Sequence, residues 1–238
     1  MKKRHLRLAA LTAGVLLTAQ TGLSAAALST FDAAYYAAQY PDVAAVCGND
    51  EGALLRHYLD HGIDEGRKPS ADGIAGDDEL FLTEAQFSSV WSPVAINKLT
   101  HYKSLKSKCT DEEFAQAYQE ALKVVTPLAL MSREDQLYGI ASALRAVVDD
   151  GSMAYSMEAN HYNDPYGYFV LRTASCAGCA RATALCLDIL GIPYEHVNEN
   201  QYAHQWCRVP MEDGSYWICD AFGLYCGPEP EPYQHLYF

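Results

Sequence analysis

Apolar residues recur at helical spacing through the middle of the chain. This period places apolar side chains along one face of a helix, where they pack against a core. Two helices are therefore predicted, and Pro127 should end the first because proline cannot continue a helix. The residues that carry the pattern are Phe114, Tyr118, Leu122 and Val125, followed by Leu137, Ile140, Ala141, Leu144 and Val148.

Three N-cap signatures indicate where helices begin. In each, a hydroxyl residue is followed three positions later by a polar side chain: Thr83 with Gln86, Thr110 with Glu113, and Ser132 with Asp135. The hydroxyl accepts a hydrogen bond from the third residue of the helix, and that residue's side chain can bond back to the N-cap. Residues 80–150 are therefore expected to be helical, with their apolar faces serving packing.

Another helix and a set of strands are predicted from residue 176 onward. The run SCAGCARATALCLDILGIP has small and apolar residues at helical spacing. Gly191 lies where a helix end favours a left-handed residue, and Pro193 follows it. The segments YEHV, HQWCRVP and SYWICDAF then alternate as strands do. Between the last two, Gly214 in the turn EDG predicts a hairpin with a three-residue loop.

The hairpin loop determines which residues of the two strands face each other. Counting back from a loop at residues 212–214 places Cys207 opposite Cys219. Side chains alternate between the two faces of a sheet, so residues two apart share a face. The face away from these cysteines is therefore predicted to carry His204, Trp206 and Asp220.

The N-terminus has the features of an export signal. MKKRHLR is cationic, LAALTAGVLLTAQTGL is apolar, and SAAALS offers small residues for cleavage, which indicates a secretory signal peptide over residues 1–26. Loss of its four cations would change the formal net charge from -13 to -17. So acidic a protein is a poor partner for nucleic acid or anionic membranes. We expect a protein that is secreted or associated with the cell surface, with no membrane span after signal cleavage.

Residues 31–70 have a pattern of their own, with the segments FDAAYY, PDV, RHYLDHG and EGR. The stretch resembles a short helical unit that recurs in secreted bacterial proteins and carries no assigned chemistry. We expect it to be a spacer or surface-attachment module. The Gly- and Asp-rich residues 71–79 are expected to be a linker. The main domain is then expected to cover residues 80–238.

Three residues of this domain have the chemistry that a nucleophilic cysteine requires. Cys176 begins its predicted helix, where backbone N–H groups and the helix dipole favour a thiolate. On the hairpin, His204 could take and return a proton. Asp220, on the same face, could hold the imidazole in the useful tautomer.

The motifs CAGCA…LGIP and HQW, with the later Asp220, resemble the transglutaminase-like superfamily over residues 132–225. This resemblance implies an α+β fold with a papain-like core, in which helices pack on an antiparallel sheet, preceded here by the small helical module. It also implies a catalytic triad: Cys176 as nucleophile, His204 as general base and acid, and Asp220 as the orienting carboxylate.

The resemblance implies chemistry at amide bonds of proteins or peptides, including cell-wall peptides, through a thioester acyl-enzyme. Either water or an amine could complete the cycle, as in a peptidase or a transglutaminase. No metal and no other cofactor are expected. Trp206 is expected to pack beside the triad. The Tyr-rich stretch 151–170 is predicted to be a long loop, with Tyr166 or Tyr168 lining the substrate cleft.

Eight cysteines in an exported chain leave other interpretations open. Cys207 and Cys219 could form a disulfide, and CAGC at a helix start is also the spacing of a thiol–disulfide oxidoreductase. Zinc bound by Cys176, Cys179, Cys207 and Cys219 is a further alternative, although Cys207 and Cys219 lack the spacing of a zinc knuckle. The same fold could also serve as a non-catalytic binding module at the cell surface.

Overall fold

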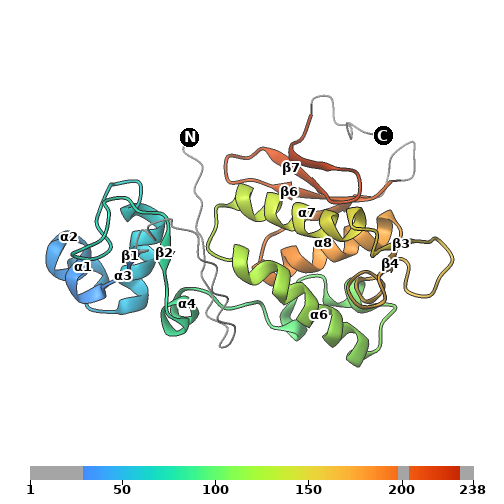
Figure 1. Cartoon of the computed structure of the whole chain (residues 1–238), viewed down its shortest axis with the longest axis horizontal. Helices are drawn as coiled ribbons and strands as arrows, with labels where there is room; N and C mark the ends of the chain where they lie inside the picture. The colour runs from blue at the N-terminus through green and yellow to red at the C-terminus, as the bar shows by residue number, and fades with distance from the viewer. Residues whose placement is uncertain (1–28, 198–203, 231–238) are drawn as a thin grey trace, which may run out of the picture. The chain divides into compact units, whose positions relative to one another are not determined.

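The structure is a computed structural model that describes residues 29–197 and 204–230. The chain divides into two compact units, one extending to Ser92 and the other beginning at Pro93 (Figure 1). The predicted signal peptide lies outside the described residues. No helix within the described ranges combines the length and the apolar character needed to cross a bilayer.

The first unit is a group of short helices around an aromatic centre. Tyr36 and Tyr58 are fully buried there and meet edge to face, with ring centroids 5.6 Å apart. Asp32 and Asp50 cap two of the helices through their carboxylates. The elements are β1 (Ser29–Thr30), α1 (Ala33–Gln39), α2 (Pro41–Cys47), α3 (Glu51–His57), a π-helical turn (Tyr58–Gly62), β2 (Leu80–Phe81) and α4 (Glu84–Val90).

The boundary between the units differs from the sequence prediction. The predicted linker at residues 71–79 and the first helix of the predicted main domain both belong to the first unit. The reason is pairing between distant segments: β1 and β2 form a parallel pair. In addition, the Gln86 side chain of α4 donates a hydrogen bond to the Phe31 carbonyl, 3.0 Å away. The larger unit therefore begins near Pro93 and not at residue 80.

The second unit holds the longer helices and a four-stranded antiparallel sheet. Its helices are α5 (Tyr102–Lys106), α6 (Asp111–Val125), α7 (Arg133–Asp149) and α8 (Cys176–Leu190), with 3-10 turns at Ile96–Lys98 and Thr126–Leu128 and a π-helical turn at Gly167–Leu171. The sheet consists of β5 (Glu195–Val197), β6 (Trp206–Pro210), β7 (Tyr216–Asp220) and β8 (Tyr225–Pro228), and a separate pair is formed by β3 (Ala154–Tyr155) and β4 (Thr173–Ala174).

Helix α8 lies at the centre of this unit. It packs on β6 and β7 of the sheet, whose strand order is β5-β6-β7-β8, and on α6 and α7 (Figure 1). Small side chains allow such close packing on several sides, and Ala182 and Ala184 are fully buried. Apolar surface removed from water in this way stabilises the fold by roughly 25 cal/mol per Å². The unit is thus an α+β arrangement with helices against an antiparallel sheet.

The predicted helix ends are confirmed. Thr83 and Thr110 each form a complete capping box, and the Ser132 hydroxyl accepts a hydrogen bond from the backbone of Asp135. Helix α6 ends at Val125, just before Pro127. At the end of α8, Gly191 takes the left-handed conformation with φ 72°.

The predicted hairpin register is confirmed as well. Cys207 of β6 pairs with Cys219 of β7. At the loop, the Met211 N–H donates to the Ser215 carbonyl at 2.9 Å, and Gly214 has a φ of 82°. Glycine suits this position because a residue with a Cβ is strained there. The observed register is therefore the one predicted from the loop.

The stretch at residues 151–170 is more ordered than the predicted loop. Strand β3 pairs in parallel with β4, and a π-helical turn follows at Gly167–Leu171.

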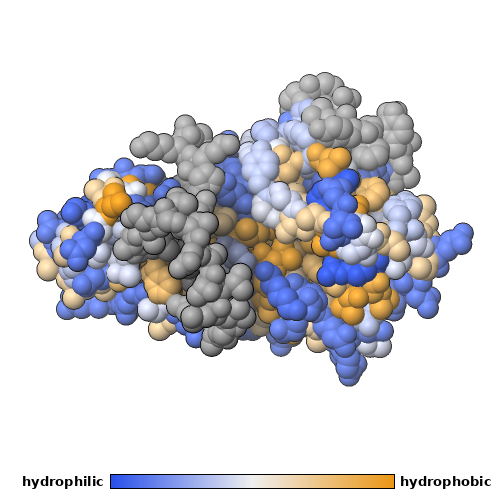
Figure 2. Space-filling view, in the orientation of Figure 1, coloured by the Kyte–Doolittle hydropathy of each residue, from blue (hydrophilic) through white to orange (hydrophobic). Residues whose placement is uncertain are grey.

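On the face of the molecule shown in Figure 2, hydrophilic residues cover much of the smaller unit, while the larger unit also carries apolar patches.

Candidate active site

The thiol of Cys176 lies at the start of α8. Ser175 is the N-cap, and its hydroxyl accepts a hydrogen bond from the Ala177 N–H at 3.2 Å. The loop before the helix is held closely, because the Ser175 N–H donates to the Tyr162 carbonyl at 2.8 Å. A Cβ at Gly178 would come within 2.5 Å of that same carbonyl oxygen, so only glycine allows this approach. These contacts set the position of the thiol at the N-terminal end of α8.

The imidazole of His204 connects Cys176 to Asp220. Its Nε2 lies 2.5 Å from Asp220 Oδ2, and the ring also hydrogen-bonds the Cys176 thiol. Since Nε2 faces the carboxylate, Nδ1 is the nitrogen available to the sulfur. His204 lies just before β6 rather than within it, and Asp220 is the last residue of β7. The ends of the two hairpin strands thus bring together the pair that the register predicted.

Asp220 is fixed on both sides of its carboxylate. While Oδ2 faces His204, Oδ1 accepts a hydrogen bond from the Gly223 N–H at 2.8 Å. Only 3% of Asp220 is exposed to solvent. A buried carboxylate held by a backbone donor can orient an imidazole without changing its own position.

The contacts of the site favour a thiolate on Cys176. Burial raises the pKa of this thiol, but hydrogen bonding to His204, the charge of the imidazolium and the N–H groups of Gln205 and Ala177 lower it below the ordinary 9.0 overall. Burial lowers the pKa of His204, yet hydrogen bonds to Asp220 and Cys176 raise it to about 9. The arrangement therefore stabilises a thiolate beside an imidazolium.

Tyr168, one of the three aromatic residues expected in the cleft, lies elsewhere. Tyr168 is fully buried in the core, and its hydroxyl donates to the Leu144 carbonyl at 2.5 Å. Tyr166 packs edge to face against His161, with centroids 5.2 Å apart. Trp206 does lie beside the candidate site, nearly parallel to the His204 ring at 5.9 Å. Because only 1% of Trp206 is exposed, it supports the imidazole and does not form a cleft wall.

All eight cysteines are within the described residues and carry free thiols. The disulfide considered between Cys207 and Cys219 is not formed, since their sulfurs donate to the carbonyls of Ala180 and Leu137. Cys226 of β8 faces Cys219 from the other side, so Cys219 has two cysteine neighbours in the sheet. Cys179 is buried, and burial raises its pKa to about 12. Cys176 is therefore the cysteine with an activating environment.

A second Cys-His-Asp group lies elsewhere in this unit and was missed by the sequence analysis. Cys109, His161 and Asp164 each offer one ligand atom, and these atoms lie within 4.8 Å of one another. His161 Nδ1 is 2.8 Å from Asp164 Oδ2. The signal available in the sequence was the spacing of three between His161 and Asp164, but nothing local connects them to Cys109.

The second group has the same residue types in a different order of contact. The Cys109 thiol hydrogen-bonds the Asp164 carboxylate, whereas the Cys176 thiol hydrogen-bonds an imidazole. Burial, followed by the negative charge of Asp164, raises the pKa of Cys109 to about 12. A thiol so far from ionising is a poor nucleophile. Of the two groups, the one at Cys176 is the candidate for cysteine catalysis.

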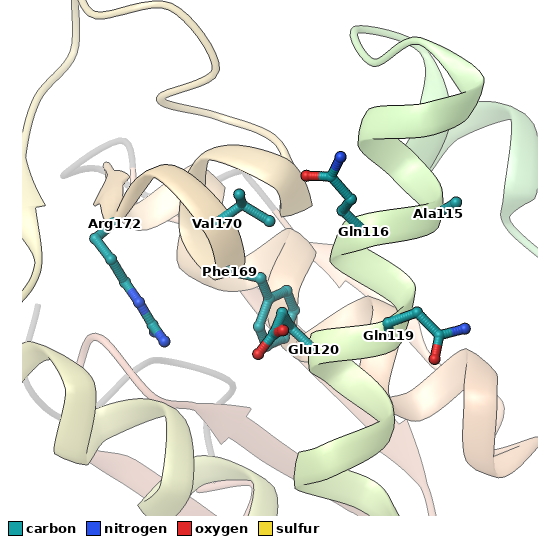
Figure 3. A pocket seen from close by; sticks show the side chains of 7 residues that line it. All are labelled: Ala115, Gln116, Gln119, Glu120, Phe169, Val170 and Arg172. Carbon is teal, nitrogen blue, oxygen red and sulfur yellow. The ribbon is translucent and has the colours of Figure 1, made fainter.

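Two cavities of the unit differ in how close they come to the candidate site. A groove of about 510 Å³ lies between α6 and the π-helical turn, and Figure 3 shows the Arg172 and Glu120 side chains there among amide and apolar neighbours. It is lined by Ala115, Gln116, Gln119, Glu120, Phe169, Val170 and Arg172, which include no thiol or imidazole. A cavity of about 270 Å³ has Asp220 in its wall, together with Tyr138 and Arg145. The second cavity, and not the first, adjoins the candidate site.

Comparison with known proteins adds no family assignment. No protein-family model matches the chain, and no curated protein matches it either.

Proposed function

We propose that this protein is a thiol enzyme that acts on amide bonds of proteins or peptides through Cys176, His204 and Asp220. The observation that carries the proposal is the position of the His204 imidazole, which bonds the Cys176 thiol on one side and Asp220 on the other. The motifs that resemble the transglutaminase-like superfamily agree with this role, and so does the α+β arrangement of helices on an antiparallel sheet.

The first half of the proposed reaction forms a thioester. The Cys176 thiolate attacks the amide carbonyl carbon, and a C–S bond forms as the carbonyl oxygen takes up negative charge. Backbone N–H groups at the start of a helix are suited to stabilise such an oxyanion. When the intermediate collapses, the C–N bond breaks, and the His204 imidazolium gives its Nδ1 proton to the departing nitrogen. Ammonia or an amine leaves, and the acyl group stays on sulfur.

The second half releases the acyl group. Neutral His204 takes a proton from water, and the resulting hydroxide attacks the thioester carbonyl. The C–S bond then breaks, which regenerates the thiolate beside the imidazolium and releases a carboxylic acid. An amine in place of water would give a new amide bond. Asp220 remains ionised throughout and holds the imidazole ring by its hydrogen bond to Nε2.

Hydrolysis is the outcome that we favour, with peptides outside the cell, including cell-wall peptides, as the substrate class. The support is the secretory signal predicted over residues 1–26 and the acidic composition, which suits a protein that works outside the cell. The first unit would then act as a spacer or attachment module. Sequencing the N-terminus of the protein recovered from the culture medium tests export, which predicts a new N-terminus close to residue 27.

The activity is tested with the purified mature chain, a glutamine-containing protein and a dansylated amine. Our proposal predicts release of ammonia or of new peptide ends, which is lost in Cys176→Ala, and little dansyl incorporation. Strong incorporation that depends on Cys176 would show transfer in place of hydrolysis and keep the same nucleophile. If Cys176→Ala cleaves as fast as the natural chain, or if neither cleaves and both bind peptide equally well, the protein is not a thiol enzyme of this kind.

A further inference from the structure

The second Cys-His-Asp group has the donors of a metal site. The Cys109 sulfur, one His161 ring nitrogen and an Asp164 oxygen all lie within 4.8 Å of one another. At Cys176, in contrast, the imidazole stands between the sulfur and the carboxylate. Three donors that surround one point can bind a single ion, whereas an imidazole between a thiol and a carboxylate can transfer a proton.

Each donor of the Cys109 group also has an outer partner. Asp164 Oδ1 accepts a hydrogen bond from the Gly167 N–H at 2.9 Å, which leaves Oδ2 directed at His161 Nδ1. The other ring nitrogen, Nε2, faces Glu113 Oε1 at 3.7 Å. The Tyr166 backbone N–H bonds the Cys109 sulfur. Histidines that bind metal usually direct their second nitrogen at a carboxylate or carbonyl, and their neighbours fix the orientation of the donors.

The nature of the donors selects the ion. Calcium and magnesium require oxygen ligands, so a thiol and an imidazole are a poor set for them. Zinc accepts cysteine sulfur, histidine nitrogen and aspartate oxygen together, most often with four ligands. The setting is favourable because Asp164 is 1% exposed and Glu113 adds a second carboxylate near the ring. Two cations oppose an ion here. Arg181 interacts with Asp164 from α8, and the Lys108 ammonium donates to Asn163 Oδ1 at 2.9 Å.

We propose that Cys109 Sγ, His161 Nδ1 and Asp164 Oδ2 bind one Zn²⁺ ion, with water as the fourth ligand and Glu113 as the partner of Nε2–H. In the zinc-bound form the hydrogen bond between His161 Nδ1 and Asp164 Oδ2 is broken, and the neutral ring carries its proton on Nε2, facing Glu113. The thiol proton of Cys109 is released to solvent. The ion would join the start of α6 to the loop at residues 161–166. That loop also carries the Tyr162 carbonyl that receives the Ser175 N–H at the start of α8. The ion would therefore hold the segment that supports Cys176.

The test uses the full chain without a histidine tag, stripped with a chelator and then loaded with Zn²⁺ or Co²⁺. After removal of excess metal, elemental analysis should find about one zinc per chain in the natural protein and in Cys176→Ala. Cys109→Ala should bind zinc at least 100-fold more weakly. Glu113→Gln should weaken binding by roughly 10- to 100-fold, as expected for an outer partner. With Co²⁺, a sulfur-to-cobalt charge-transfer band should be present in Cys176→Ala and absent in Cys109→Ala.

Two results would overturn the proposal. A natural protein that is folded by circular dichroism but retains no zinc would show that the group is only a hydrogen-bonded contact. Zinc that is lost in Cys176→Ala and kept in Cys109→Ala would place the ion at the candidate active site. If Cys109→Ala fails to fold, the first result is still read from the natural chain. The second is then read from Cys176→Ala and Glu113→Gln: zinc lost from folded Cys176→Ala and bound with unchanged affinity by Glu113→Gln would place the ion away from Cys109.

Discussion

The larger unit contains two groups with the same three residue types and opposite chemical properties. At Cys176 the thiol contacts an imidazole, and its pKa lies below the ordinary 9.0. At Cys109 the thiol contacts a carboxylate, and burial together with that charge raises its pKa to about 12. The difference teaches that the order of contact, and not composition, decides the chemistry. A ring between sulfur and carboxylate moves protons, whereas three donors around one point suit an ion.

Replacing each cysteine in turn should give the largest contrast. Cys176→Ala removes the nucleophile, so amide hydrolysis should fall by roughly 10⁴-fold or more. Cys109→Ala removes no reacting atom and should lose far less activity, through disturbance of the loop that supports α8. The rate of ammonia or peptide release measures both, with Cys47→Ser in the first unit as the matched control. Equal losses of activity in Cys176→Ala and Cys109→Ala would contradict the different roles of the two groups.

The two aspartates provide the next contrast. Asp220→Asn keeps the size of the side chain but favours the wrong tautomer of His204, so kcat should fall by roughly 10²- to 10⁴-fold. Asp164→Asn should cost activity much less and reduce zinc binding instead. The measurement is kcat beside metal content for both variants. A kcat for Asp220→Asn close to that of the natural chain would show that the His204–Asp220 hydrogen bond has no part in catalysis.

The pH dependence of activity and of stability should reveal the thiolate–imidazolium pair of Cys176 and His204. Because the pKa of Cys176 is lowered below 9.0 and that of His204 is raised to about 9, activity should be present below pH 9 and decline as pH rises through about 9. His204 gains a partner on folding, so its stabilising effect is complete below pH 6.5 and is lost as pH rises toward 9. Rate profiles and chemical denaturation at several pH values measure both effects. An activity that keeps rising above pH 9 would contradict the thiolate–imidazolium pair.

The smallest expected effect concerns Tyr168, which was predicted in the cleft and lies in the core. Tyr168→Phe removes a buried hydrogen bond to the Leu144 carbonyl and should lower the free energy of unfolding by about 1 kcal/mol. KM should not change. Tyr166→Phe is the matched control, because Tyr166 is only partly buried. Denaturant unfolding measures the free energy of unfolding, and steady-state kinetics measure KM. A raised KM with unchanged stability would show that Tyr168 contacts the substrate.

Local patterns predicted much of the structure of the larger unit. Capping boxes act within one turn of a helix, so Thr110 with Glu113 could be recognised from four residues. The hairpin register followed from the loop and from the alternation of side chains, which is why the contact between His204 and Asp220 was anticipated. In both cases the determining interactions lie between residues that are near in sequence or related by a fixed period.

Features that depend on distant contacts were missed. The boundary near Pro93 depends on the pairing of β1 with β2, two strands of two residues each, which leave no periodic pattern. The approach of Cys109 to His161 depends on how a loop folds back onto α6. An aromatic side chain in a loop can face the core or solvent, and nothing local distinguished Tyr168 from a cleft residue.

Selective alkylation tests the central claim most directly. The folded chain is treated with limiting iodoacetamide at a pH below the ordinary thiol pKa, and the labelled cysteine is identified by peptide mass analysis. We predict that Cys176 reacts first, well before Cys109, and that His204→Ala slows its labelling sharply. The account is contradicted if Cys109 or another cysteine reacts first, or if the loss of His204 leaves the labelling of Cys176 unchanged.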